Sequence, residues 1–196
     1  PWRAVISHNA SFALVSDIAN HCVRKIVLAT KAVSTVAGSS QGFADGVGSA
    51  AKFNAPHGLA IASDDSFALV ADFDNHRVRR IDLATRAVST LAGSSQGLAD
   101  GTGAQAKFSH PINLAVSPDD TYVLIIDSYN HRIRKLDLTT KAVTTVAGSL
   151  QGFEDGKGTQ ARFNRPFGIE LSRDASFALV ADAYNHRVRK IDMATT

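Results

Sequence analysis

The stretch SFALVADFDNHRVRRI, residues 66–81, decides the fold. It consists of two short runs rich in β-branched and apolar residues, separated by a polar segment, which is typical of two antiparallel strands joined by a turn. The stretch occurs four times, each copy starting 55 residues after the one before, at positions 11, 66, 121 and 176. The chain is therefore a run of one repeated unit, and this periodicity governs the interpretation of every other pattern.

The segments between the copies also match, and a proline opens each unit at positions 1, 56, 111 and 166. We treat residues 1–196 as one continuous region of four units. These units cover residues 1–55, 56–110, 111–165 and 166–196, the last of them partial. Each full unit is predicted to contain four short strands and a polar link. In the second unit the strands are expected at residues 58–62, 67–71, 77–82 and 88–92, and the link at 93–106.

A four-stranded sheet cannot bury both of its faces by itself, so neighbouring units must cover one another. We predict an all-β fold, a β-propeller of four-stranded antiparallel blades. The alternative is a linear β-solenoid, but 55 residues is the size of a propeller blade, whereas solenoid coils are shorter. Phe53, Phe108 and Phe163 recur just before the first strand and are expected to wedge between blades.

The inner strands of the propeller are expected near residues 3–6, 58–62, 113–116 and 168–171. The fourth unit lacks the counterpart of the strand at 88–92, so we expect an open arc of a larger ring. Such an arc leaves a sheet face uncovered at each end. We therefore expect further blades of the same or another chain, or a protein partner, to complete it. The alternative is a closed four-bladed ring whose axis is plugged by Trp2 and Phe167.

A more specific pattern recurs within the repeat: Asp-x-x-Asn-His-x-[Val/Ile]-Arg-[Lys/Arg], preceded in the second unit by Phe-Asn-Ala-Pro-His-Gly-Leu at residues 53–59. This pattern resembles the NHL repeat, and the resemblance covers essentially the whole chain. It implies propeller blades in rings that commonly number six. The matching residues, which we assign to a structural repeat motif, are Asp17, Asn20, His21, Asp72, Asn75, His76, Asp127, Asn130, His131, Asp182, Asn185 and His186.

The four Asn-His pairs do not predict a metal site, because each histidine belongs to a different blade and metal ligands must converge on one point. The Asp-Gly-x-Gly segments of the links, which begin at Asp45, Asp100 and Asp155, offer too few carboxylates for calcium and are interpreted as turns. We expect no metal, no cofactor and no catalytic residue in this chain.

Related propellers include lyases that bind a catalytic zinc through histidines directly after the repeat's proline. The residues at this position are Trp2, His57, Ile112 and Phe167. Only His57 matches, so we interpret it as a possible channel-lining residue, while a lyase or hydrolase that uses the channel remains one alternative. A second alternative is RNA binding, because the third strands concentrate basic residues. Acidic residues are interleaved with them and aromatic platforms are scarce, so we expect no nucleic acid.

The composition is the balance expected of a soluble globular protein. Hydrophobic residues make up 44% of the 196 and charged residues 20%, with a formal charge of +3, and no apolar run is long enough to span a membrane. The single Cys22 excludes an intramolecular disulfide. The sequon Asn9-Ala10-Ser11 is usable only in a secreted protein, so the compartment stays open. The favoured hypothesis is a non-enzymatic protein-interaction or structural scaffold.

Overall fold

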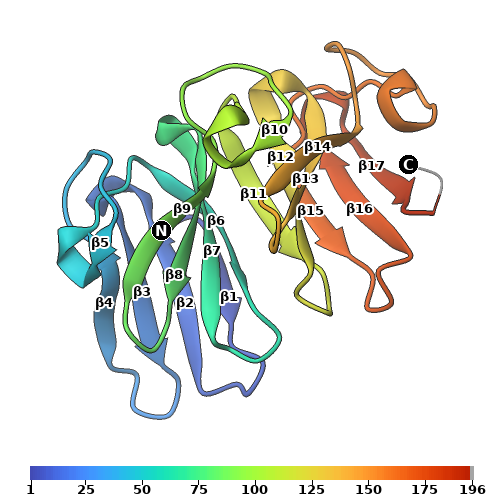
Figure 1. The fold of residues 1–196 in the computed structure, drawn as a ribbon. Helices are drawn as coiled ribbons and strands as arrows, with labels where there is room; N and C mark the ends of the chain where they lie inside the picture. Colours follow the sequence, from blue (N-terminus) through green and yellow to red (C-terminus); the bar gives the residue numbers. More distant parts are fainter. Residues whose placement is uncertain (195–196) are drawn as a thin grey trace.

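The computed structural model describes residues 1–194 and consists of four antiparallel sheets that follow one another as propeller blades (Figure 1). Each blade is a meander in which consecutive strands pair. Blade 1 has strands β1 (Ala4–Ile6), β2 (Phe12–Asp17), β3 (Cys22–Val27) and β4 (Val33–Gly38). Blade 2 has β6 (Pro56–Ile61), β7 (Phe67–Asp72), β8 (Arg77–Asp82) and β9 (Ala87–Ala92). Blade 3 has β11 (Pro111–Val116), β12 (Tyr122–Asp127), β13 (Arg132–Asp137) and β14 (Ala142–Ala147). Blade 4 has β15 (Gly168–Leu171), β16 (Phe177–Asp182) and β17 (Arg187–Asp192). The predicted β-propeller fold and its strand meander are confirmed.

The link between blades is more ordered than the sequence indicated. A two-residue strand in each of the first two links pairs with the outer strand of the following blade: β5 (Gly46–Val47) with β9, and β10 (Gly101–Thr102) with β14. Blades 2 and 3 are therefore five-stranded. Short 3₁₀ turns follow in all three links: η2 (Gly48–Ala50), η4 (Gly103–Gln105) and η6 (Gly158–Gln160). The link thus belongs in part to the blade that comes after it.

Neighbouring blades are held together by three apolar clusters, one at each blade-to-blade interface. The cluster between blades 2 and 3 joins Leu69 and Val78 of one sheet to Val123 and Ile125 of the next. The repeated phenylalanine lies in each cluster, and its exposed fraction is at most 2%. The predicted wedge is confirmed, since Phe53, Phe108 and Phe163 fill the space between two sheets that face each other.

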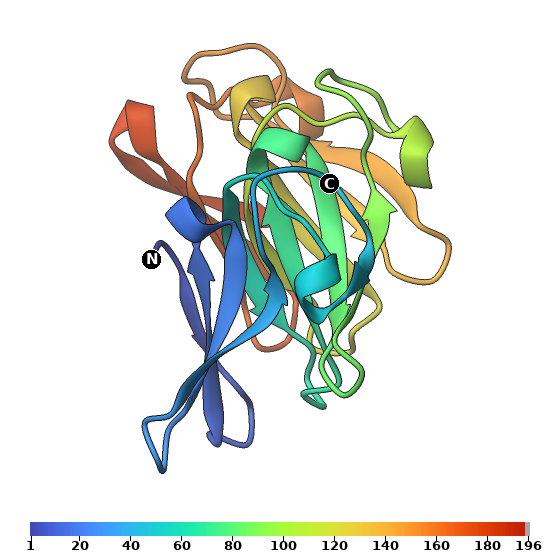
Figure 2. The same cartoon turned by 90° about the vertical axis from the view of Figure 1, so that its left-hand side faces the viewer.

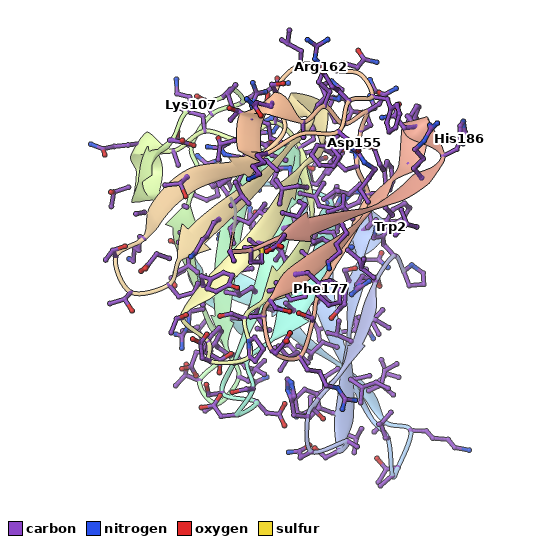
Figure 3. The ribbon with its side chains drawn as sticks, turned by 90° about the vertical axis from the view of Figure 1, so that its right-hand side faces the viewer. Trp2, Lys107, Asp155, Arg162, Phe177 and His186 are labelled. Carbon is purple, nitrogen blue, oxygen red and sulfur yellow. The ribbon has the colours of Figure 1, made fainter. Side chains whose placement is uncertain are left out.

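The two end blades each leave one sheet face uncovered. In blade 4, Leu179 is 43% exposed and Val188 73% exposed, whereas the corresponding Leu69 and Val78 of blade 2 are fully buried. Figure 3 looks onto this face, on which Phe177 is labelled. In blade 1, Ile6 is 63% exposed on the sheet face opposite the one that packs against blade 2. The four blades therefore form an open arc, as expected.

Side chains of the first and last blades nevertheless meet near the axis. Arg3 forms a 3.8 Å ion pair with Glu170, and the rings of Trp2 and Phe167 have their centroids 6.2 Å apart. A cavity lies between the inner strands, with Arg3, Leu59, Leu114 and Glu170 among its lining residues. The axis is thus partly filled by Trp2 and Phe167, as in the closed-ring alternative, while the outer parts of the end sheets stay open.

The strand order places two kinds of loop at opposite ends of the blades. Hairpin turns join the first strand to the second and the third to the fourth, and they lie at one end (Figures 1 and 2). At the other end lie the links and a 3₁₀ turn between the second and third strands of every blade. These turns are η1 (Ile18–Asn20), η3 (Phe73–Asn75), η5 (Ser128–Asn130) and η7 (Ala183–Asn185). We call the end with the links and these four turns the link face.

Candidate functional site

A buried ionic network fixes the link face of blade 2. The carboxylate of Asp72, which is fully buried, accepts hydrogen bonds from the Asn54 backbone N–H at 2.8 Å, Asn75 Nδ2 at 2.9 Å and Arg79 Nη1 at 2.6 Å. The guanidinium of Arg79 reaches the link through Nη2, which lies 2.7 Å from Asp45 Oδ1. Each charge is therefore paired as burial demands, and the network binds the link to the strands.

The same network recurs in blades 3 and 4. In blade 3, Arg134 donates to Asp127 at 2.7 Å and to Asp100 at 2.6 Å. In blade 4, Arg189 bonds to two aspartates in the same way, at 2.9 and 2.6 Å. Blade 1 shows only the bond from Asn20 to Asp17, at 2.9 Å. The motif aspartates and asparagines thus serve as framework residues in the structure.

The role of the link aspartates was missed in the sequence. Asp45, Asp100 and Asp155 were interpreted as turn residues, yet each forms an ion pair with the second arginine of a third strand. Each aspartate lies 34 residues before its arginine. The 55-residue period shows that the aspartates are equivalent to one another and the arginines likewise, but it does not show that an aspartate contacts an arginine. The available signal was that one aspartate recurs in every link while the second arginine recurs in the third strands of units 2, 3 and 4.

The four motif histidines occupy equivalent positions, each directly after its 3₁₀ turn. All four have left-handed backbone conformations, with φ between 53° and 57°, a region that histidine enters more readily than most residues. Three of them accept a hydrogen bond through Nδ1 from the residue before the next blade's proline. His21 accepts from Ala55 N–H at 3.2 Å, His76 from His110 at 3.2 Å and His131 from Arg165 at 3.1 Å.

These bonds require a neutral imidazole whose Nδ1 carries a lone pair. Burial lowers the pKa of His131, and the nearby cations Arg165 and Arg132 lower it further. Burial also lowers the pKa of His76, followed by the effect of His110. Both rings are therefore held in the neutral form that the contact needs. His21, His76 and His131 each position a residue that precedes the following blade, a function that their recurrence alone did not reveal.

Within residues 1–194, the structure brings together no group of three or more histidine, cysteine or acidic residues that would suit a metal ion. The motif histidines lie one to a blade, so they do not converge. Burial raises the pKa of the Cys22 thiol. The link carboxylates Asp45, Asp100 and Asp155 are instead held in ion pairs of the network described above.

His57 lies in a row of rings on the link face. Its Nδ1 donates to the Ala55 carbonyl at 2.8 Å, and its ring stacks on Phe73 with centroids 4.1 Å apart. Trp2 contacts the same imidazole at 5.1 Å. Burial lowers the pKa of His57. The residue is absent from the lining of the axial cavity and instead connects blades 1 and 2 at their link face.

The row continues without a break into blades 3 and 4. Phe73 lies 4.8 Å from His110, and His110 lies 4.3 Å from Tyr129. The Arg165 guanidinium lies 4.4 Å from the Tyr129 ring and 5.5 Å from the Tyr184 ring. We call this row the aromatic strip. Its members are Trp2, His57, Phe73, His110, Tyr129, Arg165 and Tyr184.

The strand order explains why these residues share one face. Trp2, His57, His110 and Arg165 stand at or just before the start of an inner strand. Phe73, Tyr129 and Tyr184 stand in the 3₁₀ turns after the second strands. In an antiparallel pair, the start of one strand lies beside the end of its partner. Trp2, Tyr129 and Tyr184 are 53%, 42% and 54% exposed, so the strip presents rings to solvent.

The basic residues of the third strands, in contrast, are engaged within the protein. Besides the buried framework arginines, Arg77, Arg132 and Arg187 each donate to a backbone carbonyl of a 3₁₀ turn. Four others lie over the rings that open the second strands: Lys25, Arg80, Lys135 and Lys190. The view that aromatic platforms are scarce is wrong for the link face. Three of the strip's rings, Phe73, Tyr129 and Tyr184, stand at the variable positions of the motif. A comparison of the repeats shows no residue shared by all four units there and therefore gives no sign of a common surface.

The fold and the recurring framework define a β-propeller built from one four-stranded unit. Residues 53–81 match the family described as NHL repeat. The chain is 32% identical over 157 residues to human NHL repeat-containing protein 2, covering 74% of this chain and 22% of that protein. It is 34% identical over 151 residues to Protein SUPPRESSOR OF QUENCHING 1, chloroplastic, of Arabidopsis thaliana, covering 72% and 14%. The chain belongs to the NHL-repeat propeller family, and it spans less than a quarter of the length of these relatives.

Solved structures share the fold. An auxiliary nutrient binding protein from Bacteroides thetaiotaomicron superposes with a TM-score of 0.76 at 22% identity, covering 94% of this chain and 46% of that one. Virginiamycin B lyase from Staphylococcus aureus superposes with a TM-score of 0.63 at 12% identity, covering 98% and 52%. At such identities the likeness concerns the fold alone. Within residues 1–194, no helix is long and apolar enough to cross a membrane.

Proposed function

We propose that this chain is a non-enzymatic interaction scaffold whose link face binds a protein partner. The aromatic strip carries the proposal, because it extends across all four blades and exposes Trp, Tyr and Arg side chains. These residue types contribute most to the binding energy of protein interfaces. Loops on a rigid framework are also where binding residues concentrate.

The contrast between recurring framework positions and varying strip positions supports this function. The framework positions recur in every unit, and in blades 2, 3 and 4 they hold their partners with ion pairs, as Asp72 and Arg79 do. The strip positions vary more than the framework does: the residue before the proline is Ala55, His110 or Arg165, whereas Tyr129 and Tyr184 are identical. The blades therefore contribute a varied set of side chains to one continuous surface. A surface of this kind discriminates between partners, whereas a purely structural repeat would need no such variation.

A channel lyase is the rival function, and His57 is its only imidazole at the positions after the prolines. In the structure, the Nδ1 of His57 donates to a carbonyl and its ring stacks on Phe73. That bond leaves Nε2 free, but a zinc ligand also needs partners that converge with it, and residues 1–194 bring together no group of three or more histidine, cysteine or acidic side chains. We therefore propose that His57 supports the strip and does not take part in catalysis.

The test compares the wild-type chain with a Tyr129→Ala, Tyr184→Ala double variant. Partners captured from a lysate are identified by mass spectrometry, and each one is purified and titrated against both proteins by calorimetry. We expect the double variant to bind at least about tenfold more weakly, about 1.4 kcal/mol. Leu28→Ala, on a hairpin turn and 40% exposed in the wild type, is the control and should bind normally. Equal affinities, or stoichiometric zinc in the purified protein, would exclude the scaffold function.

A further inference from the structure

The clearest chemical feature of the aromatic strip is the side chain of Arg165. Its backbone is fixed on both sides: the N–H donates to His131 Nδ1 at 3.1 Å, and the buried Pro166 follows. Its φ of 43° lies in the left-handed region, where a residue other than glycine stays only under such constraints. The site is therefore preorganised at the level of the main chain.

The guanidinium is held as well. It lies over the ring of Tyr129 at 4.4 Å and near that of Tyr184 at 5.5 Å. Both tyrosines are more than 40% exposed, so the guanidinium lies beside two rings that face solvent. Cation–π contacts use the faces of a guanidinium and leave the N–H groups along its edge available.

No carboxylate of residues 1–194 forms an ion pair with Arg165. The contrast with the framework is clear, because Arg79, Arg134 and Arg189 each hold two aspartates. Arg165 thus offers a planar set of N–H donors whose geometry matches a carboxylate in bidentate fashion. We propose that the aromatic strip binds an acidic segment of a partner protein, with one carboxylate on Arg165.

The surroundings favour a peptide carboxylate over the phosphates of a nucleic acid. A nucleic acid needs a line of free cations, but the third-strand basic residues are engaged with the protein's own carboxylates, carbonyls and rings. Asp74, whose side chain is 42% exposed, lies 3.7 Å from His110 in the middle of the strip and repels a polyanion. A peptide instead has apolar side chains for the Trp2 and Phe73 end and an isolated acid for Arg165.

This inference rests on the proposed function, and its test uses a phage-displayed library of random peptides selected on the immobilised chain. We expect the enriched peptides to share an aspartate or glutamate next to apolar residues. Resynthesised peptides are then titrated by fluorescence anisotropy. Arg165→Gln should weaken binding at least about tenfold, since a charge-assisted hydrogen bond contributes about 1.5–3 kcal/mol.

The matched control is Arg173→Gln, which removes the same charge from the hairpin end of the same blade. It should bind as the wild type does. Enriched peptides without acids, or an unchanged affinity of Arg165→Gln, would overturn the inference and leave the scaffold function standing. Failure to enrich any peptide also counts against it. Tighter binding of oligouridylate than of any peptide, lost in Arg165→Gln, would assign the site to a nucleic acid instead.

Discussion

At the scale of single residues, a charge buried in this fold is tolerated only because two neighbours share it. Arg79 is fully buried and holds Asp72 and Asp45, so it joins a strand to a link that lies 34 residues earlier. A buried salt bridge of this kind adds little net stability, because the cost of removing both charges from water offsets their attraction. Removing one partner nevertheless leaves the other charge without compensation, and that cost is large.

The variant Arg79→Ala is therefore expected to lower the free energy of unfolding by about 3–5 kcal/mol, because Asp72 remains buried without its cation. Equilibrium unfolding in urea measures the change. Arg80→Ala, at the next position, removes a guanidinium that lies over Phe67 at 4.4 Å and is expected to cost less than about 1 kcal/mol. Similar costs for the two variants would contradict the role assigned to the network.

A second prediction concerns the neutral histidines. The pKa of His131 is lowered in the folded chain from its ordinary value of 6.5, so the unfolded chain takes up a proton first as the pH falls. The stability that His131 contributes is therefore present above about pH 6.5 and is lost as the pH falls through the unfolded and then the folded pKa.

His131→Asn is the matched variant, because asparagine accepts the left-handed conformation and retains an acceptor oxygen but does not titrate. The wild type minus variant difference in unfolding free energy should decrease as the pH falls from about 8 to about 5, because the pKa of His131 is lower in the folded chain. The measurement is urea unfolding at several pH values. A difference that grows toward acid pH would show that the sign is wrong.

At the scale of elements, the inner strands β6 and β11 approach each other closely at Gly58. A Cβ there would lie 2.6 Å from Asn113 Cα and 2.7 Å from the Ile112 carbonyl oxygen, both on the backbone of β11. The backbone has no room to retreat, since β11 is itself packed between two sheets. Glycine is therefore required by the packing of two strands.

Gly58→Ala is expected to destabilise the chain by about 1–3 kcal/mol through overpacking. The control is Gly168→Ala, at the same position of blade 4, where a Cβ would meet only Ala181 Cβ at 3.3 Å. That change is expected to cost at most about 1 kcal/mol. Thermal unfolding of both variants checks the pair, and equal shifts in Tm would contradict the strand contact as the cause.

At the scale of the whole molecule, the arc ends on two uncovered sheet faces that match the buried faces of the inner blades. Val188 is 73% exposed, and its counterpart Val78 is fully buried. Exposed apolar sheet faces promote association. We expect concentration-dependent self-association of this chain through the end blades.

Val188→Lys should raise the concentration at which association begins by at least about tenfold, because a charged side chain resists burial. Light scattering over a dilution series measures the effect. Val47→Lys is the control, since Val47 is 59% exposed but lies in β5 on a link, away from both end faces. A wild-type chain that stays monomeric at all concentrations would show that these faces do not associate.

Periodicity along the chain was sufficient for the blades themselves. The 55-residue register, the alternation within residues 66–81 and the recurring Phe53 determine strands, turns and the wedge between sheets, because these depend on local side-chain patterns. The same register placed the four motif histidines at equivalent positions. Features that all copies of the repeat share can be predicted from the sequence alone.

Only the tertiary structure decided what happens between blades. The pair of Asp45 and Arg79, the bond from Arg165 to His131 and the aromatic strip all join one blade to its neighbour or to the link between them. Their contacts depend on the angle at which one sheet packs on the next, and no pattern within a unit encodes that angle. The strip is hidden further because its members, such as Tyr129 and Arg165, stand where the repeats differ, so that they form one surface only once the blades are packed.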